Sequence, residues 1–224
     1  MSIKHHPDDA TIIAYASGTL DEAFAVLISC HLETCPDCHD RLATANTVGG
    51  AVLADMTDTI EPDAGSFGRL LERISISPSD EYVGASYKND SKALRKDSTP
   101  KALYSYIKCD IEEVDWRKVG PGIWQKPIQL SENANSSLRL LRIRNGYKVP
   151  EHGHNGQEIT LILQGAYQDE IGHFGVGDVA DLDEDIEHQP IVVSDEDCIC
   201  LAATEAPTRF KGIASRLMQP FIGI

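Results

Sequence analysis

The sequence has few basic residues for its length. Of its 224 residues, 20 are Lys or Arg and 35 are Asp or Glu, which gives a formal net charge of −15. A chain this acidic repels the phosphate backbone of nucleic acids and attracts basic surfaces. We therefore expect no direct binding to nucleic acid, and the charge favours a protein partner that is itself basic.

Long apolar runs are also missing. No stretch approaches the roughly 20 apolar residues that a membrane-spanning helix needs, and the start, MSIKHHPDD, lacks the apolar core of a signal peptide. The hydrophobic share of 42% and the charged share of 25% are typical of a globular protein and exclude a wholly disordered chain. We expect a cytoplasmic protein that does not bind membranes.

The six cysteines are unevenly placed. Three of them, Cys30, Cys35 and Cys38, lie within nine residues and beside His31. Secreted disulfide scaffolds instead spread their cysteines through a short chain. The cluster therefore indicates metal chemistry.

The first part of the chain has the apolar periodicity of helices. Helices are expected from Pro7 to about Gly18 and over residues 21–31, 36–54 and 66–74. Gly49 and Gly50 weaken the prediction in the middle of the third helix. A stretch rich in Ser, Asp and Lys follows and is typical of a linker. These patterns predict three segments, namely a helical domain at 1–77, a linker at 78–102 and a second domain at 103–224.

The second domain has short apolar runs separated by Gly, Asn and Asp. The clearest runs are residues 123–130, 138–144, 159–164 and 198–204. Many short strands with turns between them are typical of an antiparallel sandwich or barrel. The predicted fold class is therefore α + β multidomain, with an N-terminal helical bundle and a C-terminal antiparallel β-barrel.

The cysteine cluster contains the pattern HxxxCxxC, formed by His31, Cys35 and Cys38. One helical turn can direct both thiolates at one ion, and the histidine lies one turn earlier. Zinc takes four nitrogen or sulfur ligands in a closed structural site. The alternative is a pair of small buried side chains beside a surface histidine. If zinc binds, a fourth ligand must come from elsewhere, and the nearby candidates are His5, His6 and His39.

The segments HHPDDATIIAYASGTL and HLETCPDC resemble the zinc-binding anti-sigma domain of bacterial anti-sigma factors. Members of that family sequester extracytoplasmic-function sigma factors. The resemblance covers about the first 50 residues, and it places histidine directly before the Pro-Asp start of the first helix. It therefore implies four zinc ligands, His6, His31, Cys35 and Cys38.

A second group of metal-ligand residues lies in GYKVPEHGHNGQEITLILQG. His152 and His154 lie on the same face of a strand, and Glu158 keeps that parity. His188 follows thirty residues later, after an acidic run at 181–187 that is interpreted as a solvated loop or as a group that raises the basicity of His188. Three imidazoles and a carboxylate can bind zinc, iron, manganese or nickel and leave room for water or a small ligand. The alternative is a barrel with surface histidines.

The same segment resembles the first cupin motif, G(X)5HXH(X)3E(X)6G, at every position from Gly146 to Gly165. The segment GVGDVADLDEDIEHQP resembles the second cupin motif less closely, because only its histidine is in place. The resemblance implies a cupin barrel, which is a double-stranded β-helix. It also implies four metal ligands, His152, His154, Glu158 and His188.

Cys198 and Cys200 alternate on one of the predicted strands. We interpret them as buried core thiols that become candidates for oxidation if they lie near the cupin metal. A direct disulfide between residues two apart on an extended strand is strained.

An anti-sigma-like domain followed by a cupin is similar to the ChrR-type anti-sigma factors, and CLAATEAPTRF resembles their last core strand. The resemblance implies zinc in both sites, no catalytic residues, inhibition of a sigma factor by the helical domain, and release in response to singlet oxygen or organic peroxides. One alternative is a metal-dependent cupin enzyme, such as a dioxygenase, with a regulatory helical extension. Another is a cupin sensor that binds a small ligand and has no sigma-factor partner.

Overall fold

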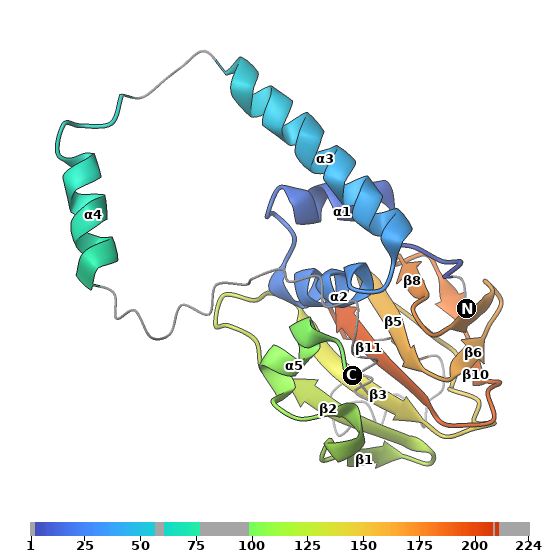
Figure 1. Cartoon of the computed structure of the whole chain (residues 1–224). Coiled ribbons are helices and arrows are strands. Elements are labelled where there is room, and N and C mark those ends of the chain that lie inside the picture. Colours follow the sequence, from blue (N-terminus) through green and yellow to red (C-terminus); the bar gives the residue numbers. More distant parts are fainter. Residues whose placement is uncertain (1–2, 57–60, 77–98, 208, 211–224) are drawn as a thin grey trace. The chain divides into compact units, whose positions relative to one another are not determined.

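The computed structural model describes residues 3–56, 61–76, 99–207 and 209–210 (Figure 1). Its helices are α1 (Asp9–Ala16), α2 (Glu22–Leu32), α3 (Pro36–Asp55), α4 (Ser66–Ile76), α5 (Lys101–Ile107) and the short 3₁₀ helix η1 (Ile111–Glu113). The first four lie where the periodicity predicts them, and α3 continues through Gly49 and Gly50. Most of the expected linker, residues 78–98, lies outside the described residues. Among the described residues, no helix combines the length and apolarity that crossing a membrane requires.

The starts of the N-terminal helices follow from the local sequence. The Asp8 side chain accepts a hydrogen bond from the Thr11 amide at 2.6 Å, and Asp21 caps α2 in the same way. Both carboxylates satisfy amides that have no partner within the helix. Pro36 opens α3, a position where its missing N–H removes no helical hydrogen bond.

The remaining described elements are antiparallel strands. They are β1 (Arg117–Gly120), β2 (Ile123–Ile128), β3 (Ser137–Ile143), β4 (His152–Gly153), β5 (Glu158–Gln164), β6 (Ala166–Gln168), β7 (His173–Gly175), β8 (Val179–Leu182), β9 (Glu187–His188), β10 (Ile191–Val192), β11 (Cys198–Thr204) and β12 (Arg209–Phe210). They form one sheet in the order β1-β2-β3-β11-β5-β8 and two smaller sheets, β10-β6-β7 and β12-β4-β9. The predicted class, a helical region followed by an antiparallel β domain, is confirmed.

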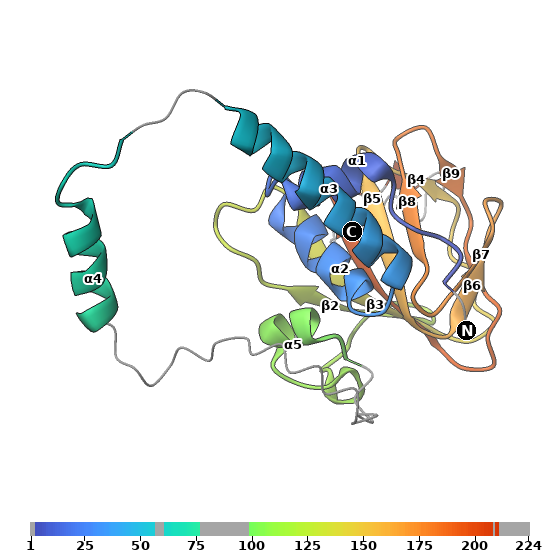
Figure 2. The same ribbon diagram turned by 45° about the horizontal axis from the view of Figure 1, so that its top comes forward.

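Helix α2 packs against β11, β5 and β3 of the large sheet (Figure 2). One buried cluster joins apolar side chains of the helix and of these strands, including Phe24, Leu27, Ile28, Leu140, Leu161 and Leu201. The described residues within 3–49 and 99–210 accordingly form one compact unit. The first two helices and the barrel thus share a core, while the domain limits at 77 and 102 stay a prediction.

Acidic side chains at the two ends of α2 hold loops of the β domain. Glu22 accepts a hydrogen bond from the Ser131 amide at 3.0 Å. Glu33 accepts from the amides of Lys101 and Ala102 at 3.0 and 2.8 Å. These amides open α5, so a carboxylate of α2 meets the positive end of that helix. These contacts hold both ends of α2 in place against the β domain.

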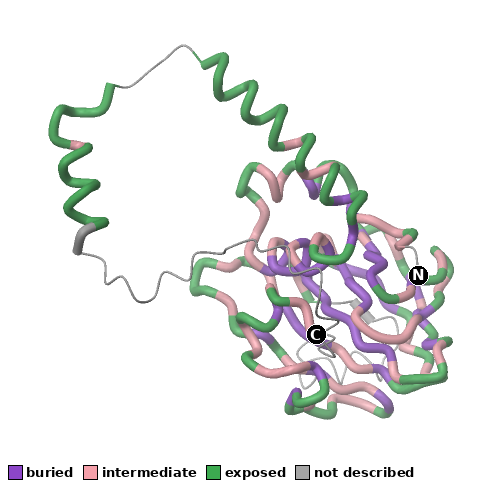
Figure 3. The backbone as a smooth tube through the Cα atoms, viewed as in Figure 1, coloured by how far each residue is buried: buried purple, intermediate pink, exposed green. Residues whose placement is uncertain are grey.

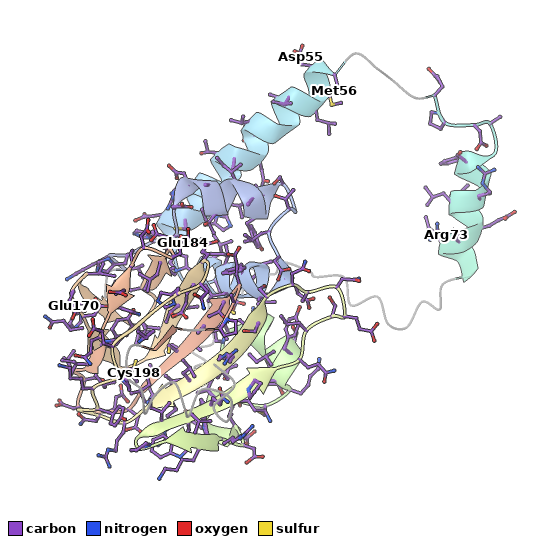
Figure 4. All side chains as sticks on the ribbon, turned by 180° about the vertical axis from the view of Figure 1, so that it is seen from behind. Asp55, Met56, Arg73, Glu170, Glu184 and Cys198 are labelled. Atoms are coloured by element: carbon purple, nitrogen blue, oxygen red, sulfur yellow. The ribbon has the colours of Figure 1, made fainter. Side chains whose placement is uncertain are left out.

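Strand β11 is buried on both faces, which explains its uninterrupted apolar sequence. Ile199 and Leu201 belong to the cluster shared with α2. Cys198 and Cys200 belong to a second cluster, with Tyr167 and side chains of the smaller sheets, and Figure 4 labels Cys198. Burial raises the pKa of Cys198 to about 12 and also raises that of Cys200 well above its ordinary value. The interpretation of both as buried core thiols is confirmed.

We expect Leu27→Ala to lower the free energy of unfolding by about 2–5 kcal/mol, because Leu27 is fully buried in the shared core. Chemical denaturation of the full chain measures this change. Leu53→Ala is the matched control, since Leu53 is 71% exposed and its truncation should change stability by less than about 0.5 kcal/mol. An equally small effect at both positions would contradict the shared core.

The second compact unit comprises residues 50–96, of which the structure describes the end of α3 and α4. Figure 3 shows both helical segments almost entirely exposed. On α4 the apolar side chains recur at helical spacing and are 48–71% exposed; they are Phe67, Leu70, Leu71 and Ile74. These side chains form an apolar face of α4 that the described residues leave exposed.

Candidate functional site

The predicted helical site forms a tight cluster. The ligand atoms of His6, His31, Cys35 and Cys38 all lie within 4.8 Å of one another. His6 Nδ1 lies 3.3 Å from Cys35 Sγ and 3.4 Å from Cys38 Sγ. Tetrahedral zinc with bonds of about 2.0–2.3 Å places its ligand atoms roughly 3.3–3.8 Å apart. The cluster therefore has the dimensions that a zinc site requires.

His31 is oriented toward this cluster from the end of α2. Its Nδ1 donates a hydrogen bond to the carbonyl oxygen of Gly177 at 2.9 Å. Its Nε2 is buried and finds no hydrogen-bond partner among the described residues. Burial lowers the pKa of His31 to about 4, so the imidazole is neutral. A neutral ring with one lone pair facing the thiols is the form that binds a metal.

Cys35 directly precedes α3, and Cys38 lies in the first turn of that helix. Burial, and then the neighbouring Cys35 thiol, raise the pKa of Cys38 to about 11. Arg41, one turn later, places Nη1 3.5 Å from Cys38 Sγ and is held by Asp9. A cation bound in the cluster would stabilise the thiolate, and Arg41 adds positive charge on the same side.

The other candidates for this site lie elsewhere. The His5 ring packs on Phe174, with ring centroids 4.4 Å apart. His39 is exposed on α3, and Cys30 is buried in the core shared with the barrel. Of the three nearby histidines, the structure brings only His6 into the cluster.

The second predicted group also converges, inside the β domain. The ligand atoms of His152, His154, Glu158 and His188 lie within 4.8 Å of one another. His152 on β4 pairs directly with His188 on β9, and Glu158 opens β5. His188 Nε2 lies 3.1 Å from His152 Nε2 and 3.3 Å from His154 Nε2. Three imidazole nitrogens thus surround one point, as in a metal site.

The charges in this group suit a cation. Burial, followed by the nearby His188, lowers the pKa of His152 to about 4, which keeps its ring neutral. Burial alone would raise the pKa of Glu158, but the hydrogen bond to His154 and the neighbouring His152 and His188 together outweigh it and lower the pKa. Glu158 Oε2 lies 3.2 Å from His154 Nδ1. A neutral His152 ring beside an ionised Glu158 carboxylate matches the protonation states of metal ligands.

Two of these histidines are oriented by partners outside the ligand set. His152 Nδ1 donates to the Pro150 carbonyl at 2.9 Å, and His188 Nδ1 donates to Asp169 Oδ2 at 2.8 Å. Such partners fix the ring and the nitrogen that binds a metal. The carboxylate that contacts His188 is Asp169, after β6. That the acidic run at 181–187 also raises the basicity of His188 stays a prediction. Asp169 carried no local signal in the sequence.

Comparisons with known proteins identify the family of the chain. The family model of the ChrR cupin-like domain matches residues 105–207. The anti-sigma-E factor ChrR of Cereibacter sphaeroides is 38% identical over 225 residues, and the match covers 100% of both chains. A crystal structure of Rhodobacter sphaeroides SigE in complex with the anti-sigma ChrR is similar with a TM-score of 0.76 and 35% identity, covering 91% of this chain and 99% of that chain.

The full-length match includes both the helical region and the cupin-like domain, in the predicted order. It favours the regulatory prediction over the alternative of a cupin dioxygenase, since the relative is an anti-sigma factor. The chain therefore belongs to the ChrR family of anti-sigma factors.

Proposed function

We propose that this chain is a cytoplasmic anti-sigma factor that sequesters an extracytoplasmic-function sigma factor and releases it under stress from singlet oxygen or organic peroxides. The observation that carries the proposal is the similarity along the full chain to a ChrR protein, together with the likeness to a structure whose anti-sigma chain is bound to SigE. Occlusion of the sigma factor's contacts with RNA polymerase requires no catalysis.

The uncovered apolar faces of the helices support a protein partner. Val48, Val52 and Leu53 on α3, and Met56 directly after it, are 59–71% exposed. The apolar face of α4, defined above, is exposed to a similar degree. Exposed apolar stripes of this kind mark binding surfaces on soluble proteins, because they gain free energy when a partner covers them. We propose that the sigma factor covers both faces, and that basic patches on it add electrostatic attraction to this acidic chain.

We further propose that both clusters bind zinc. Two thiolates and two imidazoles in a closed set favour zinc in the helical site, where it would hold the first turns of α3 to the N-terminal arm and α2. Three imidazoles and a carboxylate accept several metals, and zinc in the barrel is proposed from the family. The division into a helical domain at 1–77, a linker at 78–102 and a cupin domain at 103–224 belongs to the same proposal.

We expect Leu70→Asp on α4 to weaken binding of the sigma factor by at least about 30-fold, as for the loss of a buried apolar anchor worth about 2 kcal/mol. Calorimetry or surface plasmon resonance with the purified full chain measures the affinity. Val193→Asp is the matched control, because Val193 is 47% exposed on the barrel and Leu70 is 51% exposed. Equal affinities for the two variants would contradict a partner surface on α4.

A further inference from the structure

The N-terminal arm that carries His6 is held by the barrel. The amides of Lys4 and His5 donate to Asp178 Oδ1 at 2.6 and 3.0 Å. The carbonyl of His5 accepts a hydrogen bond from the Val179 amide at 3.1 Å. The backbone that precedes His6 is therefore held by the side chain of Asp178, in the short turn between β7 and β8, and by the first amide of β8.

The same turn orients His31. The carbonyl of Gly177 accepts from His31 Nδ1, so that Nε2 faces the thiols. Gly177 has φ +88°, and a Cβ there would lie 2.8 Å from the Ile3 side chain. Glycine is thus required both by the backbone conformation and by the close approach of the arm. Two adjacent residues of the barrel thus position two predicted ligands. Gly177 holds the His31 ring, and Asp178 holds the backbone before His6.

The segment of residues 169–178 begins at the other cluster. Its first residue, Asp169, accepts from His188 Nδ1, and its amide donates to the Gly172 carbonyl at 3.0 Å. Near its end, Asp178 Oδ2 accepts from the Gly175 amide at 2.8 Å. This ten-residue segment, stiffened by internal hydrogen bonds, therefore accepts a hydrogen bond from Nδ1 of one histidine in each cluster. These are His188 in the barrel cluster and His31 in the helical cluster.

We infer that residues 169–178 complete the helical metal site and link it to the barrel site, with Asp178 and Asp169 as positioning residues. The inference rests on the two metal sites proposed above. A metal in the barrel fixes His188 and with it Asp169, and this restrains the turn that supports His6 and His31. Metal affinity in each site then depends on the other, and the dependence is reciprocal.

Cobalt gives a readout of the helical site alone, because thiolates bound to cobalt absorb in the near ultraviolet and the barrel cluster contains no cysteine. In the full chain, Asp178→Ala is expected to bind cobalt in this site about 10- to 100-fold more weakly, the usual effect of losing an outer partner of a ligand. Asp178→Asn keeps an oxygen that can accept the two amides, and it should retain most of the affinity.

Asp197→Ala is the matched control, because Asp197 also accepts a backbone amide, from Asn145, but touches neither the arm nor a predicted ligand. Equal loss of affinity in Asp178→Ala and Asp197→Ala would overturn the positioning role. Asp169→Ala should weaken cobalt binding at the thiolates about fivefold or more. If the cobalt affinity measured from the thiolate absorption band is unchanged in Asp169→Ala, the link between the two sites is overturned. If the wild-type chain shows no thiolate band with cobalt, the helical metal site itself is contradicted.

Discussion

Cys38→Ser is expected to remove the metal of the helical site and to abolish binding of the sigma factor. Cys38 is fully buried, and its sulfur lies 3.4 Å from His6 Nδ1. A structural zinc contributes about 10–16 kcal/mol to the folding of small zinc domains at neutral pH, so its loss should release the arm and the start of α3. Metal analysis and a pull-down with the full chain measure both effects.

The matched control for this variant is Cys109→Ser. Cys109 is partly buried but belongs to neither metal cluster. This control should keep both metals and full binding of the sigma factor. A Cys38→Ser chain that bound the sigma factor with unchanged affinity would remove the helical metal from the mechanism.

His152→Ala is expected to empty the barrel site and to suppress most of the response to singlet oxygen, while binding of the sigma factor persists. His152 lies on β4, and no member of the barrel cluster belongs to α3 or α4. Three imidazoles and a carboxylate leave room for a small oxidant, whereas two thiolates and two imidazoles close the helical site. The barrel is therefore the expected entry point of the signal.

A reporter gene driven by the sigma factor, read with and without singlet oxygen, measures this effect. His173→Ala is the matched control, because His173 is an exposed barrel histidine outside the cluster. It should keep normal induction. Normal induction in a His152→Ala chain that has lost its barrel metal would contradict a signal received there.

The buried thiols of β11 are weaker candidates for that oxidation than the metal cluster. The thiolate is the reactive form of cysteine, and burial raises the pKa of Cys198 to about 12 and that of Cys200 well above its ordinary value. Both therefore remain protonated inside the barrel. Their oxidation requires that the barrel first opens, which loss of the nearby metal would favour.

The metal clusters are the part of the site that the sequence predicts best. His31, Cys35 and Cys38 lie within about two helical turns of one another along the chain. His152 and His154 have the two-residue spacing of one face of a strand, although β4 ends at Gly153. Such patterns depend on local geometry, which the sequence displays directly. Selection of His6 over His5 and His39 depended on the family resemblance.

Other features depend on tertiary contacts and could not be predicted. Strands β4 and β9 have two residues each, too few for any alternation to be visible. Asp169, Gly177 and Asp178 contact residues 19, 146 and 174 positions away in the chain. Likewise, the apolar face of α2 indicates that it is covered but not that the sheet of the barrel covers it.

Native mass spectrometry of the full chain co-expressed with the extracytoplasmic-function sigma factor of the same genome tests the central claim most directly, because one spectrum reports both partner and metal. We expect a complex of the two proteins that carries two zinc ions, and we expect the complex to dissociate when a chelator removes the helical zinc. A chain that carries its metals but forms no complex with the sigma factor would contradict the proposed function.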